Sequence, residues 1–127
     1  MNYLLDASAV IAFLLQEPGW EKVSDVLLAR QATITSVNLA EVATILVRCG
    51  ASYEDACSAC RDLALHIIDV DAAIALESVR LAPDGKRLGL SLGDRICLAA
   101  AKLHGCVALT GDRVWQELSD YRVVCFR

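Results

Sequence analysis

Short apolar runs, separated by longer segments with helical signals, constrain the fold of this chain more than any other feature of its sequence. The runs lie at 2–5, 33–35, 67–68, 107–109 and 123–126. Apolar strands this short, alternating with helices, are typical of βαβ units, in which helices cover both faces of a parallel sheet. The sequence therefore predicts an α/β fold: a single-domain α/β/α sandwich whose short-stranded, mainly parallel central sheet is flanked by helices.

Capping signals place the helices between these runs. Ser36 is expected to cap the third helix, and Ser52 and Ser91 are each followed three residues later by an aspartate, as in a capping box. The polar stretch 83–87, which begins with a proline, is expected to be a loop. The expected helices span 7–15, 20–30, 36–49, 52–65, 71–82 and 91–104.

Length and composition indicate one folded domain over 1–127. Of the 127 residues, 56% are apolar and 22% are charged, which argues against intrinsic disorder. No apolar run approaches the roughly 18 residues of a membrane span. The opening segment differs from a signal peptide because it lacks a basic stretch and Asp6 interrupts it. We therefore expect a cytoplasmic protein that makes no contact with a membrane.

The six cysteines are expected to be reduced, small apolar packing residues. A core of this size does not need disulfides, and no secretory signal accompanies the cysteines. Cys57 and Cys60 have the spacing of a redox or zinc pair. There is no second such pair, however, and neither His66 nor His104 is spaced to complete a site.

Three aspartates stand where an open α/β sheet forms its binding crevice, close to the carboxyl ends of strands. Asp6 follows the first predicted strand, Asp112 follows the fourth, and Asp94 lies in the first turn of the helix that Ser91 opens. Each position also has an ordinary structural interpretation. Asp6 suits a helix N-cap, Asp94 suits a capping box, and Asp112 suits a turn.

Glu41 is harder to explain by structure alone. Its helix is apolar nearly all round, which predicts burial, and no Lys or Arg lies three or four residues away to pair with it. A buried carboxylate without a partner is costly, so we expect a positive group to face it. Asn38, one turn earlier on the same face, offers a neutral polar companion.

Taken together, the four acids predict a metal site. Clustered carboxylates repel one another, so one pocket cannot hold all four ionised without a cation. Because no His or Cys supports them, the ligands are all hard oxygen atoms, which favours Mg²⁺ or Mn²⁺ over Zn²⁺. One ion or a pair of ions would activate a water molecule to attack a phosphodiester, with no nucleophilic side chain.

Four segments, in order along the chain, resemble the PIN-domain ribonucleases, specifically the VapC-type toxins of prokaryotic toxin–antitoxin pairs. They are Leu-Leu-Asp-Ala-Ser at 4–8, Asn-Leu-Ala-Glu-Val at 38–42, Ser-Leu-Gly-Asp-Arg-Ile-Cys-Leu-Ala at 91–99 and Leu-Thr-Gly-Asp-Arg at 109–113. The resemblance, which covers essentially the whole chain, implies that the catalytic and metal-binding acids are Asp6, Glu41, Asp94 and Asp112. It adds Ser8 and Thr110 as supporting residues. Some members of the family carry a further acid at the position where this chain has Val114. The resemblance therefore does not decide whether a second metal ion binds.

The resemblance also implies Mg²⁺-dependent endonucleolytic cleavage of RNA, with Mn²⁺ as a substitute. The implied partners are a VapB-like antitoxin that binds tightly and blocks the site, and a second copy of the chain in a homodimer. Apolar residues at helical spacing suit either the core or a partner face: Ile11, Leu14, Leu15, Trp20, Val23 and Leu27. The candidate contacts to RNA phosphates are Lys86, Arg87, Arg95 and Arg113.

Two other functions remain as alternatives. A catalytically silent PIN scaffold that binds protein or RNA would be marked by a missing acid, and none of the four is missing. A receiver-like signalling domain would carry an acidic pair after the first strand, whereas residues 6–8 are Asp-Ala-Ser.

The net charge of −4 is unusual for a protein that binds a polyanion. Without the four candidate acids, 12 acidic and 12 basic residues remain, so the excess negative charge equals the predicted metal site. We therefore expect RNA binding to depend on a bound cation.

Overall fold

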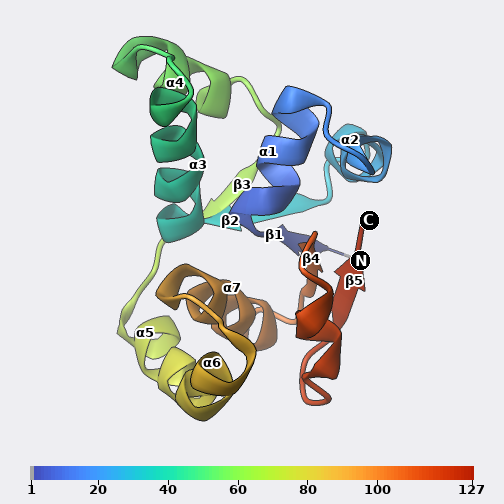
Figure 1. Cartoon of the computed structure of the whole chain (residues 1–127), viewed down its shortest axis with the longest axis vertical. Helices are drawn as coiled ribbons and strands as arrows, with labels where there is room; N and C mark the ends of the chain where they lie inside the picture. Colours follow the sequence, from blue (N-terminus) through green and yellow to red (C-terminus); the bar gives the residue numbers. More distant parts are fainter. Residues whose placement is uncertain (1) are drawn as a thin grey trace.

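The computed structural model describes residues 2–127 and contains a five-stranded sheet in which neighbouring strands are all parallel (Figure 1). The spatial order of the strands is β3-β2-β1-β4-β5. Their bounds are β1 Tyr3–Leu5, β2 Ala32–Thr35, β3 His66–Ile68, β4 Val107–Thr110 and β5 Val123–Cys125. The predicted α/β fold with a short-stranded parallel sheet is confirmed.

Helices cover both faces of this sheet (Figure 1). One face carries α1 (Ala7–Leu15), α2 (Trp20–Leu28), α3 (Ser36–Arg48) and α4 (Tyr53–Arg61). The other carries α5 (Ala72–Ser78), the 3₁₀ turn η1 (Val79–Leu81), α6 (Ala82–Leu88) and α7 (Leu92–Leu103), with a second turn, η2 (Arg113–Glu117), between β4 and β5.

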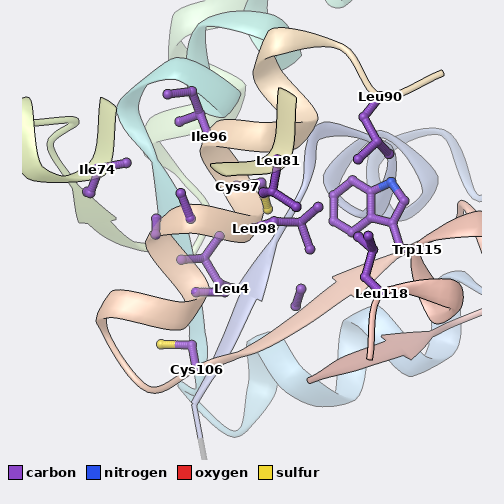
Figure 2. Packing of buried hydrophobic residues seen from close by; sticks show 14 of the residues in the cluster. Leu4, Ile74, Leu81, Leu90, Ile96, Cys97, Leu98, Cys106, Trp115 and Leu118 are labelled. Atoms are coloured by element: carbon purple, nitrogen blue, oxygen red, sulfur yellow. The ribbon is translucent and has the colours of Figure 1, made fainter. Parts of the chain in front are cut away.

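Each face of the sheet has its own buried apolar cluster. Figure 2 shows the cluster around α7, where the fully buried Trp115 packs with Leu90 and Leu118. Burial of one such side chain contributes about 2 kcal/mol, so these two clusters fix the helices against the sheet and hold the ends of β1 and β4 in place.

The order of the strands identifies the place where a site is expected. The chain steps from β1 outward to β2 and β3, and then returns to place β4 and β5 on the other side of β1. The order therefore reverses between β1 and β4. Open α/β sheets bind ligands beyond the carboxyl ends of the strands at this switch point, and Asp6 and Asp112 lie just beyond those two ends.

The prediction of a polar loop at 83–87 is wrong, because these residues form most of α6. The helix expected over 71–82 is divided into α5, η1 and the start of α6. Pro83 lies in the first turn of a new helix, where its missing N–H costs nothing. Asp84 in the first turn and Arg87 in the last match the helix dipole, and the two side chains pair at 2.9 Å.

The cap of α3 also differs from the prediction. Thr35, the last residue of β2, is the N-cap, and its hydroxyl accepts from the backbone N–H of Asn38 at 3.0 Å. Ser36 instead accepts from the N–H of Val70 at 3.1 Å, which ties α3 to the chain after β3. The last residue of β2 therefore also caps α3, and no residue lies between the strand and the helix. Beyond it, α4 ends at Arg61 rather than near residue 65.

All six cysteines are free. Cys60, Cys97 and Cys106 are buried as expected, but Cys49 is exposed, so the prediction that every cysteine packs in the core is wrong for that residue. Within residues 2–127, no helix has both the length and the apolar character needed to cross a bilayer.

Candidate active site

One pocket, of about 340 Å³, lies beyond the carboxyl ends of β1 and β4 and is lined by all four predicted acids. They come from four separate segments of the chain: the β1–α1 junction, α3, the first turn of α7 and the start of η2. The pocket is lined by Asp6, Ala7, Ser8, Glu41, Asp94, Gly111, Asp112 and Arg127.

Asp6 combines a structural role with a position in the pocket. It is the N-cap of α1, and its Oδ1 accepts from the N–H of Ala9 at 2.9 Å and from the hydroxyl of Ser8 at 2.7 Å. Its Oδ2 accepts from the hydroxyl of Thr110 at 2.5 Å. Only 5% of Asp6 is exposed. Burial raises the pKa of this carboxyl from 3.8 to about 6, and the charge of Asp94 adds to the rise while the hydrogen bonds oppose it.

Ser8 and Thr110 connect Asp6 to the loop that carries Asp112. The hydroxyl of Ser8 donates to Asp6 and accepts from the N–H of Gly111 at 3.0 Å. The hydroxyl of Thr110 donates to Asp6 and accepts from the N–H of Asp112 at 3.0 Å. Because both hydroxyls are engaged on both sides, they fix the orientation of Asp6 and the distance between the two strand ends.

Asn38 orients Glu41. Its side-chain amide donates to Oε1 of Glu41 at 2.7 Å and to the carbonyl of Gly93 at 3.2 Å, and its oxygen accepts from the hydroxyl of Thr35 at 2.6 Å. Only 1% of Asn38 is exposed. The residue is therefore a fully bonded bridge between α3 and α7.

The prediction that α3 is buried on all sides is wrong. A single stripe of the helix is buried, at Asn38, Val42 and Leu46, and Glu41 is half-buried beside it. Its side chain opens into the pocket. Within residues 2–127, no ion pair to Glu41 is present, so Asn38 takes the place of the positive partner that we expected.

Asp94 and Asp112 both act as helix caps and both line the pocket. Asp94 forms a reciprocal capping box with Ser91, at 2.9 and 3.1 Å. Asp112 caps η2 by accepting from the N–H of Val114 at 3.1 Å. Burial raises the pKa of Asp94, and the charge of Asp112 raises it further, while the hydrogen bonds to Ser91 lower it. The carboxylates are thus close enough to repel one another.

The donor set of the pocket suits a hard divalent cation. The four acidic side chains that line the pocket offer only carboxylate oxygens, and the repulsion at Asp6 and Asp94 is a condition that a cation would relieve. Each carboxylate is turned toward its local hydrogen-bond donors, however. In residues 2–127, no three His, Cys, Asp or Glu side chains are gathered closely enough to enclose one ion. Metal binding would require these side chains to turn inward.

The four predicted phosphate contacts do not line the pocket. Arg95 packs against Gly85 and donates to the carbonyl of Ser78 at 3.5 Å, on the α6 side of α7. Arg87 pairs with Asp84 and Glu117 on α6, the helix that also carries Lys86. Arg113 donates to the backbone carbonyl of Arg127 at 3.1 Å.

Arg127, which the sequence interpretation missed, is the basic side chain in the pocket. β5 pairs in parallel with β4, with Cys125 opposite Thr110, so Arg127 follows β5 by two residues just as Asp112 follows β4. The rule that placed Asp6 and Asp112 at the carboxyl ends of strands, applied also to the last strand, would have identified it.

The chain matches the family model described as the PIN domain over residues 3–121. No curated protein sequence matches the chain.

Solved structures share the fold over nearly the full length. VapBC2 from Rickettsia felis, bound to a DNA fragment from its promoter, has a TM-score of 0.75 at 17% identity, covering 98% of each chain. A toxin–antitoxin complex from Klebsiella pneumoniae has a TM-score of 0.73 at 23% identity, covering 99% of this chain and 98% of that one. VapC20 from Mycobacterium tuberculosis, described as a toxin that cleaves the sarcin–ricin loop, has a TM-score of 0.70 at 14% identity, covering 91% and 95%.

Proposed function

This chain belongs to the PIN-domain family, and from that premise we propose that it is a divalent-metal-dependent endoribonuclease that acts as the toxin of a toxin–antitoxin pair. One observation carries the proposal: four carboxylates from four segments of the chain converge on a single pocket at the switch point of the sheet. A scaffold that only bound other molecules would have no need to keep charged carboxylates together against their repulsion.

In this proposal Asp6, Glu41, Asp94 and Asp112 hold Mg²⁺, for which Mn²⁺ can substitute. The bound cation supplies the positive charge that makes water a better nucleophile and offsets the charge of the phosphodiester. Ser8 and Thr110 fix the direction of the Asp6 carboxylate, and Asn38 fixes that of Glu41. The Ser8 hydroxyl is engaged on both sides, so the attacking group is water rather than a side chain.

The proposed partners are an antitoxin resembling VapB and a second copy of the chain. The structural relatives include VapBC2 and a toxin–antitoxin complex. Of the six apolar residues that we considered for a partner face, Ile11, Val23 and Leu27 are buried in the core. The other three remain partly or largely exposed and are available to a partner: Leu14, Leu15 and Trp20.

The test of the function is cleavage of total RNA by the purified protein, with new 5′ ends mapped by sequencing. We expect discrete cuts in the presence of Mg²⁺, loss of the cuts with EDTA, and recovery on addition of excess Mg²⁺ or Mn²⁺. Cleavage that persists in EDTA would contradict the metal-dependent mechanism. An absence of cuts under every metal condition would favour the silent scaffold instead.

A second prediction concerns Gly93, which lies in the first turn of α7 against Glu41. A Cβ on Gly93 would come within 2.6 Å of both Cδ and Oε1 of Glu41. Gly93→Ala is therefore expected to push Glu41 away from its present position and to weaken Mg²⁺ binding, measured by calorimetry, by about tenfold. Helix stability should not fall, because alanine is the better helix former by up to about 1 kcal/mol.

The matched control for this variant is Gly85→Ala. Gly85 also lies in a helix and also faces a flexible side chain, with its Cβ position 3.1 Å from Cδ of Arg95, but it is outside the pocket. We expect its Mg²⁺ affinity to equal that of the wild type. Equal affinity in the two variants would show that Glu41 does not bind the metal.

A further inference from the structure

We propose that Arg127 is the phosphate-binding residue of this site, and that its guanidinium contacts the RNA phosphodiester on which the four carboxylates act. The inference rests on the proposed function, because it names how that site holds its substrate. Arg127 follows β5 at the carboxyl edge of the sheet and lines the same pocket as Asp6, Glu41, Asp94 and Asp112.

The backbone that carries Arg127 is firmly anchored. The N–H of Phe126 donates to the carbonyl of Thr110 at 3.1 Å, and the Phe126 side chain is 1% exposed. Nε of Arg113 donates to the carbonyl of Arg127 at 3.1 Å. Gly19, with φ +89°, lies so close to the carbonyl of Phe126 that no side chain would fit there. The position of Arg127 is therefore set by the buried Phe126 beside it and by the hydrogen bond from Arg113.

The guanidinium lies over Gly111, which also lines the pocket. A Cβ on Gly111 would be 2.7 Å from Nε and 2.9 Å from Nη2 of Arg127, so the glycine provides the space that the side chain occupies. On the other side, Nη1 contacts Oε1 of Glu17 at 3.3 Å, and the ring of Phe126 lies 5.0 Å from Cζ. Within the described chain, Nε and Nη2 donate to no protein acceptor, and 37% of the side chain is exposed.

The charges around the pocket favour a substrate role over a purely structural one. An anionic phosphate approaching four carboxylates is repelled by whatever negative charge the bound cation leaves uncompensated, and Arg127 is the basic side chain among the residues that line the pocket. A guanidinium binds phosphate oxygens through parallel N–H groups, in a geometry that lysine does not reproduce. Nε and Nη2 form such a pair of neighbouring donors. Glu17 holds the third nitrogen and so orients the fork.

The experiment compares Arg127→Gln, Arg127→Lys and Arg122→Gln. Arg122 immediately precedes β5, donates to the carbonyl of Gly105 at 2.8 Å and is outside the pocket, so it is a matched loss of charge at the opposite end of the same strand. Each change is made in the wild type, for cleavage, and in an Asp94→Asn background, where cleavage is expected to be slow enough for binding to be measured. Binding of a labelled, mixed-sequence single-stranded RNA is then measured with Mg²⁺ over a range of salt concentrations.

We expect Arg127→Gln to weaken RNA binding and to raise KM by about 10- to 100-fold, the usual loss for a charge-assisted hydrogen-bonded pair. The slope of log affinity against log salt should fall by about 0.7, which is the loss of one phosphate contact to a single strand. Arg127→Lys should keep the slope and recover only part of the affinity. Mg²⁺ affinity should not fall, because a positive charge has been removed.

A residue that only balanced the charge of the carboxylates would change thermal stability without changing the salt slope. Equal RNA affinity and slope in Arg127→Gln and Arg122→Gln would therefore overturn the inference. If the wild type cleaves RNA but Arg127→Gln and Arg122→Gln have the same RNA affinity and salt slope, the inference about Arg127 fails and the proposed function stands. If the wild type does not cleave, the proposed function fails, and the binding comparison still decides the role of Arg127. A wild type that neither binds nor cleaves RNA overturns both.

Discussion

Asp94→Asn is expected to reduce the rate of RNA cleavage by a factor on the order of 100 to 1,000, with the fold intact. Asp94 lines the pocket, and the charge of Asp112 acts on it there. Asparagine removes that negative charge and weakens the hold on a cation. It keeps a side-chain oxygen that can accept from the N–H of Ser91, so the capping box that opens α7 should survive.

The measurement is the initial rate of cleavage of the mapped RNA fragment, alongside the melting temperature. Asp71→Asn is the matched control, because Asp71 is also a capping aspartate, accepting from the N–H of Ile74 at 2.9 Å, but it is outside the pocket. The control should cleave as fast as the wild type. A normal rate in Asp94→Asn would show that the carboxylate is only a cap, whereas a large fall in melting temperature would show that the substitution damaged the helix.

Caps and ligands were competing interpretations of these aspartates in the sequence, but the structure shows that one side chain can cap a helix and still line the pocket. Asp6, Asp94 and Asp112 each accept a backbone N–H at the start of a helix or turn and also line the pocket. In a parallel α/β fold, two of these helical starts follow strands at the carboxyl edge of the sheet, which is where the crevice lies. A capping signal at such a place therefore supports a site instead of arguing against it.

Local signals predicted the sheet and most of the helices because short apolar strands and capping residues act through near neighbours. They failed at α6, because Pro83 lies in the first turn of a helix, where proline is tolerated, and does not end one. They also failed to predict that Glu41 is only half-buried. Its burial depends on how α3 packs against α7 and not on the apolar residues of α3 alone. Arg127 directly follows the last predicted strand, so the strand-end rule points to it, but its contact with Gly111 depends on the pairing of β4 with β5.

The second large effect is a gain in stability: Asp6→Asn should raise the free energy of unfolding of the metal-free protein near neutral pH. The carboxyl of Asp6 is buried, and its pKa is raised from 3.8 to about 6. The folded state therefore binds this proton more tightly than the unfolded state does. The contribution of Asp6 to the free energy of unfolding is fully present below about pH 4, decreases between pH 4 and 6, and is absent above pH 6. The difference corresponds to about 3 kcal/mol.

Asparagine carries no charge at any of these pH values, so the variant avoids this cost. Its side-chain oxygen can still accept from the N–H of Ala9 and the hydroxyl of Ser8. The hydroxyl of Thr110 loses its acceptor, at a cost of about 1 kcal/mol. The free energy of unfolding of Asp6→Asn should therefore exceed that of the wild type by about 2 kcal/mol at pH 7.5. The variant should also lack the decrease in stability that the wild type shows between pH 4 and 6. Asp6→Ala, which loses the cap as well, should gain about 1 kcal/mol less.

Chemical denaturation of the EDTA-treated proteins between pH 4 and 8 measures these differences, and the same series in Mg²⁺ connects them to function. Wild-type protein should be stabilised as Mg²⁺ rises above its dissociation constant, because the ion binds the folded state alone. Asp6→Asn should gain nothing from Mg²⁺ and should not cleave RNA. A variant less stable than the wild type in EDTA at pH 7.5 would contradict this account. In that case burying Asp6 as a carboxylate would cost the protein no stability, and no demand for a charged ligand in the pocket would be needed to explain it.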